Sequence, residues 1–328
     1  MILLSGFADE AAIGKTIDQQ FSAFAALGME YFSIRFVDVG KGVKNVMQLD
    51  DEEIEHVRRS MDDYQLKVSS IGSPIGKVKL LDVDDGTSNA FIPFEQYLDE
   101  QVARAVELAE RFDARLIRGF SFYHPKGTQP SEHVELVAKQ LLEIAKACDE
   151  KGLTFGLEVE ANLVGQNAEL LLEIQKRVNH PALVLIFDGG NLVTQGYSTE
   201  QVVEQFRLML PHLGWIHIKD YRHPGPVQRI EHVDEESLRH FVPPSLGQSG
   251  HAEILPILKE NLEAIEERVA QRDIPGLFID MEPHVKGGGQ FGGFSGPDGF
   301  GIALRDFCEM LTQAGLDFRR RTYASISK

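Results

Sequence analysis

The sequence predicts a (β/α)8 TIM barrel, and three observations support this prediction. Short apolar runs typical of buried parallel strands alternate with amphipathic helical segments along the whole chain. Eight such units follow one another in 328 residues, without a break in composition. Several apolar runs end directly in a charged residue, as barrel strands do where they meet an active site. We therefore expect residues 1–328 to form a single TIM-barrel domain.

The expected strands and helices alternate strictly. Strands are expected at residues 2–5, 31–34, 67–71, 116–120, 154–157, 183–187, 215–218 and 276–279. Helices are expected at 16–27, 50–64, 94–112, 131–151, 167–178, 199–210, 252–270 and 302–314. Long loops are expected after strands three, seven and eight, at about residues 72–93, 221–250 and 283–300. Connections of this length usually form lids or binding loops.

The first β/α turn bears on the main alternative, an open doubly wound sheet. Its sequence is SGFADE, which lacks the Gly-x-Gly-x-x-Gly pattern that holds a dinucleotide. The absence of this pattern weakens a dinucleotide-binding version of the alternative and favours the barrel.

Composition and charge exclude some partners. The net charge is −17 and no segment concentrates Lys and Arg, so we expect no nucleic-acid partner. The N-terminal MILLSGFADE has no basic leader, and no apolar run approaches the roughly twenty residues of a membrane helix. Cys148 and Cys308 lie in amphipathic helical segments and are expected to be reduced core thiols. Together these features predict a cytoplasmic protein without a membrane partner.

Four successive strand ends, on strands five to eight, carry residues that bind metal ions. They are Glu158, Asp188, His217 and Glu282. Because the carboxyl ends of barrel strands meet on one face, we expect these side chains to converge on one divalent ion. Three carboxylates and one imidazole suit Mn²⁺, Mg²⁺ or Co²⁺ better than structural zinc, which would bring thiolates. The alternative is that these residues cap neighbouring helices or pair with Lys219 or Arg222.

Residues beside the four ligands form a second group. Glu160 lies two residues after Glu158, so on an extended chain both point the same way, and His284 similarly competes with Glu282. We place Glu160 and His284, together with Asn191, around the ligands rather than among them. Lys219 and Asp220 either contact the substrate or pair with each other.

Further candidates lie at other strand ends. Arg35 and Arg118 end strands two and four, where they could bind substrate oxygens or form structural ion pairs. His124 follows strand four and is either a substrate contact or packed beside Tyr123. Lys77 could reach the site from the long loop after strand three, or lie in solvent.

The segment after strand eight is glycine-rich and carries interleaved phenylalanines. Barrels often bind phosphate near this place, but Lys286 is the single cation nearby in the sequence. A lid whose Phe291 or Phe294 stacks on a sugar is favoured, with packing against a partner subunit as a further alternative.

These motifs together resemble the xylose isomerase-like TIM-barrel family, which includes sugar phosphate isomerases and epimerases and the ketose 3-epimerases. The resemblance lies in LE-x-E at strand five, DGGN at strand six, H-x-K-D at strand seven and ME at strand eight. The opening GFADE, the later IGSPIGK and the C-terminal EPH…GQFGGFSGP are similar to a bacterial branch of the family. The resemblance covers essentially the whole chain, and the order and spacing of the motifs carry it.

The resemblance implies one Mn²⁺-like ion, with Mg²⁺, Co²⁺ or Zn²⁺ as alternatives, held by Glu158, Asp188, His217 and Glu282. It also implies that Glu158 and Glu282 are catalytic and move protons on opposite faces of a sugar. Elementary chemistry agrees, because a metal ion polarises adjacent carbonyl and hydroxyl oxygens and stabilises an enediolate. One departure is the segment KDYRHPGP after His217: the ketose epimerases carry an arginine-containing pattern here, and Arg222 is the candidate for that arginine.

The leading hypothesis is therefore a metal-dependent isomerase or epimerase of a small sugar, forming a dimer or tetramer as the family does. A lyase or dehydratase eliminating from a 3-keto-glycoside or keto-polyol would begin with the same proton abstraction. An endonuclease IV-like DNA repair enzyme would need more His ligands and a basic groove. A non-catalytic sugar-binding barrel is the remaining alternative.

Overall fold

The computed structural model, which describes residues 1–230, 236–285 and 295–321, has a curled nine-stranded parallel sheet at its centre. The two-residue strand β11 (Phe318–Arg319) lies at its edge beside β1, and the other eight strands form the barrel. In spatial order they run β1, β10, β9, β8, β7, β6, β5 and β2, and a parallel bridge between Phe7 and Ser33 joins the two ends. This is the predicted (β/α)8 barrel. The strands are β1 (Ile2–Gly6), β2 (Tyr31–Ile34), β5 (Lys67–Ile75), β6 (Leu116–Gly119), β7 (Thr154–Glu158), β8 (Leu183–Asp188), β9 (Leu213–Ile218) and β10 (Leu277–Met281).

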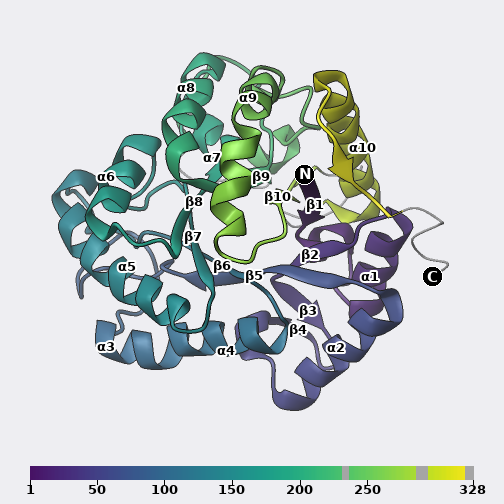
Figure 1. Cartoon of the computed structure of the whole chain (residues 1–328). Coiled ribbons are helices and arrows are strands. Elements are labelled where there is room, and N and C mark those ends of the chain that lie inside the picture. The colour runs from purple at the N-terminus through teal and green to yellow at the C-terminus, as the bar shows by residue number, and fades with distance from the viewer. Residues whose placement is uncertain (231–235, 286–294, 322–328) are drawn as a thin grey trace.

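Helices surround the strands, as Figure 1 shows. The purple α1 and the yellow α10 lie side by side, and the Phe24 and Phe300 rings are 5.2 Å apart across this contact. The first and last parts of the chain therefore complete the outer ring together. The helices are α1 (Ile17–Ala26), α2 (Asp51–Tyr64), α3 (Phe94–Tyr97), α4 (Ala103–Arg111), α5 (Val134–Asp149), α6 (Ala168–Val178), α7 (Gly189–Thr194), α8 (Thr199–Met209), α9 (His251–Ala270) and α10 (Gly296–Ala314).

The helix starts follow from their capping residues. Asp50 accepts a hydrogen bond from the Glu53 backbone N–H, and the Glu53 carboxylate accepts one from the Asp50 N–H. This reciprocal pair satisfies two backbone donors at the start of α2. Thr16 and Asn167 likewise cap α1 and α6 through their side-chain oxygens.

Several elements differ from the sequence-based expectation. The helix expected at 302–314 begins at Gly296, because Pro297 suits a first helical turn and Gly299 permits close packing. A Cβ on Gly299 would lie 1.9 Å from the Val285 carbonyl oxygen. The short helix α7 and the hairpin formed by β3 (Phe36–Asp38) and β4 (Val43–Asn45) were not expected. The expected helix 94–112 contains a π-helical turn between α3 and α4.

The barrel interior combines large rings with small residues. A Cβ on Gly119 would lie 1.9 Å from the Phe155 ring, so the glycine makes room for that ring. Hydroxyl groups from three strands meet nearby, with Ser5 Oγ 2.6 Å and Ser33 Oγ 3.2 Å from Ser69 Oγ. No helix in the described ranges is both long enough and apolar enough to span a membrane.

Candidate metal and substrate site

The four predicted metal ligands come together at the carboxyl ends of the strands. Glu158 and Asp188 are the last residues of β7 and β8, His217 lies near the end of β9, and Glu282 follows β10. All four side chains are buried. One ligand atom from each lies within 4.8 Å of the other three. The strand alternation places their side chains inside the barrel, because all four point to the same face of the sheet.

The position of His217 indicates that the cluster suits a cation. Its Nδ1 lies 3.3 Å from Glu158 Oε1, 4.0 Å from Asp188 Oδ2 and 3.9 Å from Glu282 Oε2. This buried nitrogen has no hydrogen-bond partner among the described residues. Ligand atoms about 2.0–2.2 Å from one divalent ion lie at most about 4.4 Å apart. The four side chains therefore need to move only slightly closer together to bind one ion. The donor set therefore fits a divalent metal ion.

The electrostatic balance of the cluster also favours a cation. Burial would raise the pKa of Glu158, but His217 and Arg118 together outweigh burial, and the pKa is lowered to about 2. Burial raises the pKa of Asp188 to about 6, against the opposing effect of Lys219. Burial would raise the pKa of Glu282 as well, yet Lys219 holds it well below its ordinary value. All three carboxylates are thus ionised at neutral pH, with one buried ammonium among them.

Lys219 and Asn191 orient the ligands. Lys219 Nζ lies 2.9 Å from Asp188 Oδ2 and 3.2 Å from Glu282 Oε2. The Asn191 side chain donates to Glu158 Oε1 at 3.2 Å, and its backbone N–H donates to Asp188 Oδ1 at 3.0 Å. The contact of Asn191 with both carboxylates is the supporting arrangement expected from the sequence.

A cleft of about 490 Å³ opens above the ligands. Its walls include Arg35, Lys77, Arg118 and Lys219, so several cations face the space where a substrate would lie. Arg118 Nη1 lies 3.4 Å from Glu158 Oε2 and 3.9 Å from Glu282 Oε1. Arg118 therefore lies between the two predicted catalytic glutamates.

The remaining neighbours of the ligands lie in the cleft wall. Glu160 lines the cleft, and its carboxylate forms an ion pair with Lys77 Nζ at 2.7 Å rather than joining the ligand cluster. His284 also lines the cleft, where its Nδ1 lies 2.7 Å from Glu10 Oε1. Neither belongs to the four-residue cluster, in line with the place given to them from the sequence.

Asp220 requires a correction. It was expected to contact substrate or pair with Lys219, but its Oδ1 accepts three backbone N–H groups, each at 2.8 Å, from Tyr221, Gln248 and Ser249. Within the described part of the chain it is not among the residues that line the cleft. Asp220 follows Lys219 by one position, so it faces the other side of the chain and fixes the loop before α9.

Two other predicted substrate contacts, His124 and Arg222, are not among the described residues that line the cleft. Among the described residues, His124 contacts the Pro125 carbonyl and Thr128 instead. Arg222 is exposed, and its backbone N–H donates to the His240 carbonyl. Phe291, the expected lid residue, lies outside the described residues.

Two buried acidic residues after the first strand were not predicted as part of the site. Asp9 and Glu10 follow β1 and are fully buried. Arg35 Nη2 lies 3.1 Å from Asp9 and 3.2 Å from Glu10, while its Nη1 lies 2.5 Å from Glu282. The signal was present in GFADE, where two acids come directly after an apolar run.

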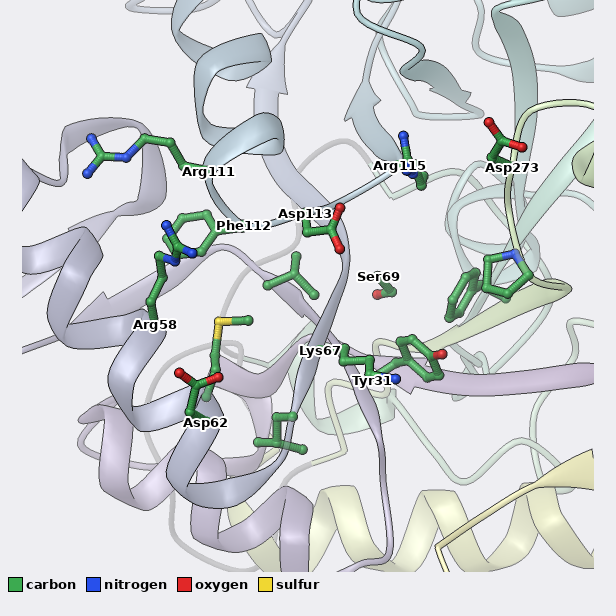
Figure 2. Close-up of a pocket in the computed structure, with 15 residues that line it drawn as sticks. Tyr31, Arg58, Asp62, Lys67, Ser69, Arg111, Phe112, Asp113, Arg115 and Asp273 are labelled. Atoms are coloured by element: carbon green, nitrogen blue, oxygen red, sulfur yellow. The ribbon is translucent and has the colours of Figure 1, made fainter.

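A second cavity, of about 410 Å³, lies at the opposite end of the barrel. Figure 2 shows Tyr31 and Lys67 beside it, and these are the first residues of β2 and β5. The strand starts form the end of a barrel that usually serves stability, and the clustered ligands lie at the other end. We therefore place the chemistry in the cleft above Glu158 and Glu282.

The chain belongs to the xylose isomerase-like TIM barrel family, whose model matches residues 21–265. None of the curated proteins matches the sequence. The family assignment confirms the resemblance seen in the motifs.

Solved structures share the fold across nearly the whole chain. The IolI protein with a bound zinc atom has a TM-score of 0.66 at 12% identity, covering 95% of this chain and 99% of its own. An L-ribulose 3-epimerase has a TM-score of 0.63 at 14% identity, covering 96% of both chains. The probable 3-DHS dehydratase AsbF of Bacillus anthracis has a TM-score of 0.63 at 16% identity, covering 94% and 99%. At these identities the likeness establishes the fold.

Proposed function

We propose that this protein is a divalent-metal-dependent sugar isomerase or epimerase that abstracts a proton alpha to a carbonyl group. The observation that carries the proposal is the direction in which the two carboxylate oxygens of each of two glutamates point. Glu158 and Glu282 each direct one carboxylate oxygen toward His217 and the other toward Arg118. One oxygen of each residue could thus bind the ion while the other faces a substrate.

The division of the two oxygens suits proton transfer. A carboxylate on each side of a substrate carbon can remove a proton from one face and return it on the other. Arg118 and Lys219 lie where negative charge would develop on the substrate oxygens, and their donors can stabilise it. A divalent ion held by Glu158, Asp188, His217 and Glu282, for which we favour Mn²⁺, would polarise the substrate carbonyl as a Lewis acid.

The activities named for the structurally similar proteins support this proposal. An L-ribulose 3-epimerase and a dehydratase share the fold, and the IolI structure holds zinc, so the family barrel accommodates both a metal and carbonyl chemistry. The polar, cation-lined cleft suits a small oxygen-rich molecule such as a sugar.

Deuterium exchange tests the proposal directly. We would incubate the EDTA-treated protein with Mn²⁺ in D₂O and a panel of ketoses, and follow the loss of each C–H signal by NMR. We expect metal-dependent exchange at the carbon next to the carbonyl, together with a new epimer or isomer. Glu282→Gln should abolish the exchange, whereas Glu253→Gln, an exposed residue of α9, should not. Measured metal binding without exchange of any substrate would refute the proposal.

A further inference from the structure

One pair of side chains in the cleft has no place in the proton transfers described above. Glu10 follows β1 and His284 follows β10, so they meet where the first and last barrel strands lie side by side. His284 Nδ1 lies 2.7 Å from Glu10 Oε1, and Glu10 is fully buried. A carboxylate that holds one nitrogen of an imidazole fixes the orientation of the ring and leaves the other nitrogen for chemistry.

Several contacts hold this pair rigidly. Glu10 Oε2 accepts hydrogen bonds from the His284 backbone N–H at 3.0 Å and from Ser295 Oγ at 3.1 Å. Arg35 joins Glu10 to Glu282, with contacts of 3.2 and 2.5 Å. The ring of His284 also packs edge-on against Phe241 at 5.1 Å. The imidazole thus has one well-defined position beside Glu282.

The free edge of the ring faces the cleft. His284 Nδ1 is buried, while the side chain is 19% exposed and lines the cleft, from which we infer that the Nε2 edge of the ring faces the cleft. His284 also has a backbone φ of +50°, a left-handed conformation that is uncommon for residues other than glycine. Such conformations persist where the surroundings impose them, often at functional sites.

A second metal site is the competing interpretation, because ligand atoms of Glu10, Glu282 and His284 lie within 4.8 Å of one another. However, the Arg35 guanidinium already contacts both glutamates of this group. Glu282 also belongs to the four-residue cluster, so this second group has two ligands of its own, Glu10 and His284, and proton transfer is the better explanation for the histidine.

We propose that His284, oriented by Glu10, is a further catalytic residue that protonates an oxygen on the carbon beta to the substrate carbonyl. This would give the site an elimination activity, and it rests on the proposed function because both begin with the same proton abstraction. A glutamate takes the alpha proton, and the C–H electron pair forms the new carbon–carbon double bond. The bond from the beta carbon to oxygen breaks with its pair on oxygen, and His284 Nε2–H supplies the proton. The products are an unsaturated ketone and an alcohol or water.

Comparing leaving groups that do and do not need protonation tests the assignment of His284 as the proton donor. Methyl and 4-nitrophenyl 3-ketoglucosides carry the same sugar, but nitrophenoxide leaves without protonation and methoxide does not. We expect the wild-type protein with Mn²⁺ to eliminate from both. His284→Gln should slow loss of methanol by roughly a hundredfold or more relative to loss of nitrophenol measured with the same variant. Glu10→Gln should show the same pattern, and His56→Gln on exposed α2 should not.

Different failures are distinguishable in this experiment. Equal slowing of both leaving groups by His284→Gln and by Glu10→Gln would assign the pair a structural role and overturn the proposal. Alpha-carbon exchange in the wild-type protein without elimination from either glycoside would overturn the proposal and leave the isomerase function intact. Absence of exchange with bound metal would overturn both. Circular dichroism and urea unfolding of each variant establish that it is folded.

Discussion

Removing the ammonium group of Lys219 is expected to make the protein depend on its metal ion. Lys219 Nζ is buried between Asp188 and Glu282, at 2.9 and 3.2 Å. Replacing it by methionine keeps the length of the side chain but leaves two buried carboxylates without their cation. Breaking a buried ion pair in this way costs about 3–5 kcal/mol, and we expect the metal-free Lys219→Met protein to lose that much unfolding free energy.

A bound divalent ion should compensate for much of this loss, because it supplies positive charge to the same carboxylates. A ligand present at 100 times its Kd adds about 2.7 kcal/mol to the stability of a folded protein. In Lys219→Met the ion no longer meets a competing ammonium group, so we expect its Kd to fall about tenfold. That factor corresponds to about 1.4 kcal/mol of additional stabilisation.

Urea unfolding in EDTA and in excess Mn²⁺ measures both effects, and isothermal titration calorimetry measures the metal Kd. Lys77→Met is the matched control. Lys77 pairs with Glu160 at 2.7 Å but is one-third exposed and lies outside the ligand cluster, so its loss should cost under about 1 kcal/mol, equally with and without metal. An equal penalty for Lys219→Met in EDTA and Mn²⁺, or weaker metal binding by that variant, would refute the reasoning.

Three further predictions concern the same region. Asn191→Ala removes the donor to Glu158 and should weaken metal binding about 10–100-fold by calorimetry, while the fold measured by circular dichroism is unchanged. Burial raises the pKa of Asp188 to about 6, so the native protein binds the extra proton between pH 3.8 and 6. Metal-free stability should therefore fall as pH rises through that window, and metal affinity should rise, by about fivefold between pH 5 and 6. A metal Kd that is constant across this window would contradict the assignment of Asp188. Asp220→Ala leaves the Tyr221 and Ser249 N–H groups without their acceptor, while the Gln248 N–H keeps the Tyr221 carbonyl at 3.0 Å, and it should cost about 3 kcal/mol in urea unfolding, with unchanged metal affinity. A larger change in metal affinity than in stability would instead place Asp220 in the site.

The barrel strands and the metal cluster were accessible to sequence reasoning for one physical reason. Parallel strands closed into a barrel all end on one face, so residues such as Glu158 and Asp188, distant in the sequence, become neighbours. The same reasoning separates Lys219 from Asp220, since successive strand residues face opposite sides. Lys219 and Asp220 follow β9 directly. The alternation therefore predicts that Lys219 faces the site and that Asp220 faces the loop that it contacts in the structure.

Other features depend on contacts that no local pattern reveals. The start of α10 at Gly296 lies in a glycine-rich segment with low intrinsic helix propensity, and tertiary packing decides its conformation. The pairing of Glu10 with His284 joins residues 274 positions apart, which depends on how the barrel closes. The positions of Arg222 and His124 follow from loop conformation, for which the sequence supplied only proximity to a strand end.

The cleft cations explain how a cluster this acidic keeps a defined geometry. The Arg35 guanidinium lies 4.4 Å from the centre of the Phe7 ring, and that of Arg118 lies 4.8 Å from the same ring and 5.0 Å from Phe120. Lys77 Nζ lies 4.2 Å from the Phe120 ring. Aromatic rings between the cations supply attraction and fix their positions, so the guanidinium groups hold the outer oxygens of the glutamates in the cleft. The inner oxygens contact Lys219, Asn191 and His217 instead, on the side where we propose that the metal ion binds.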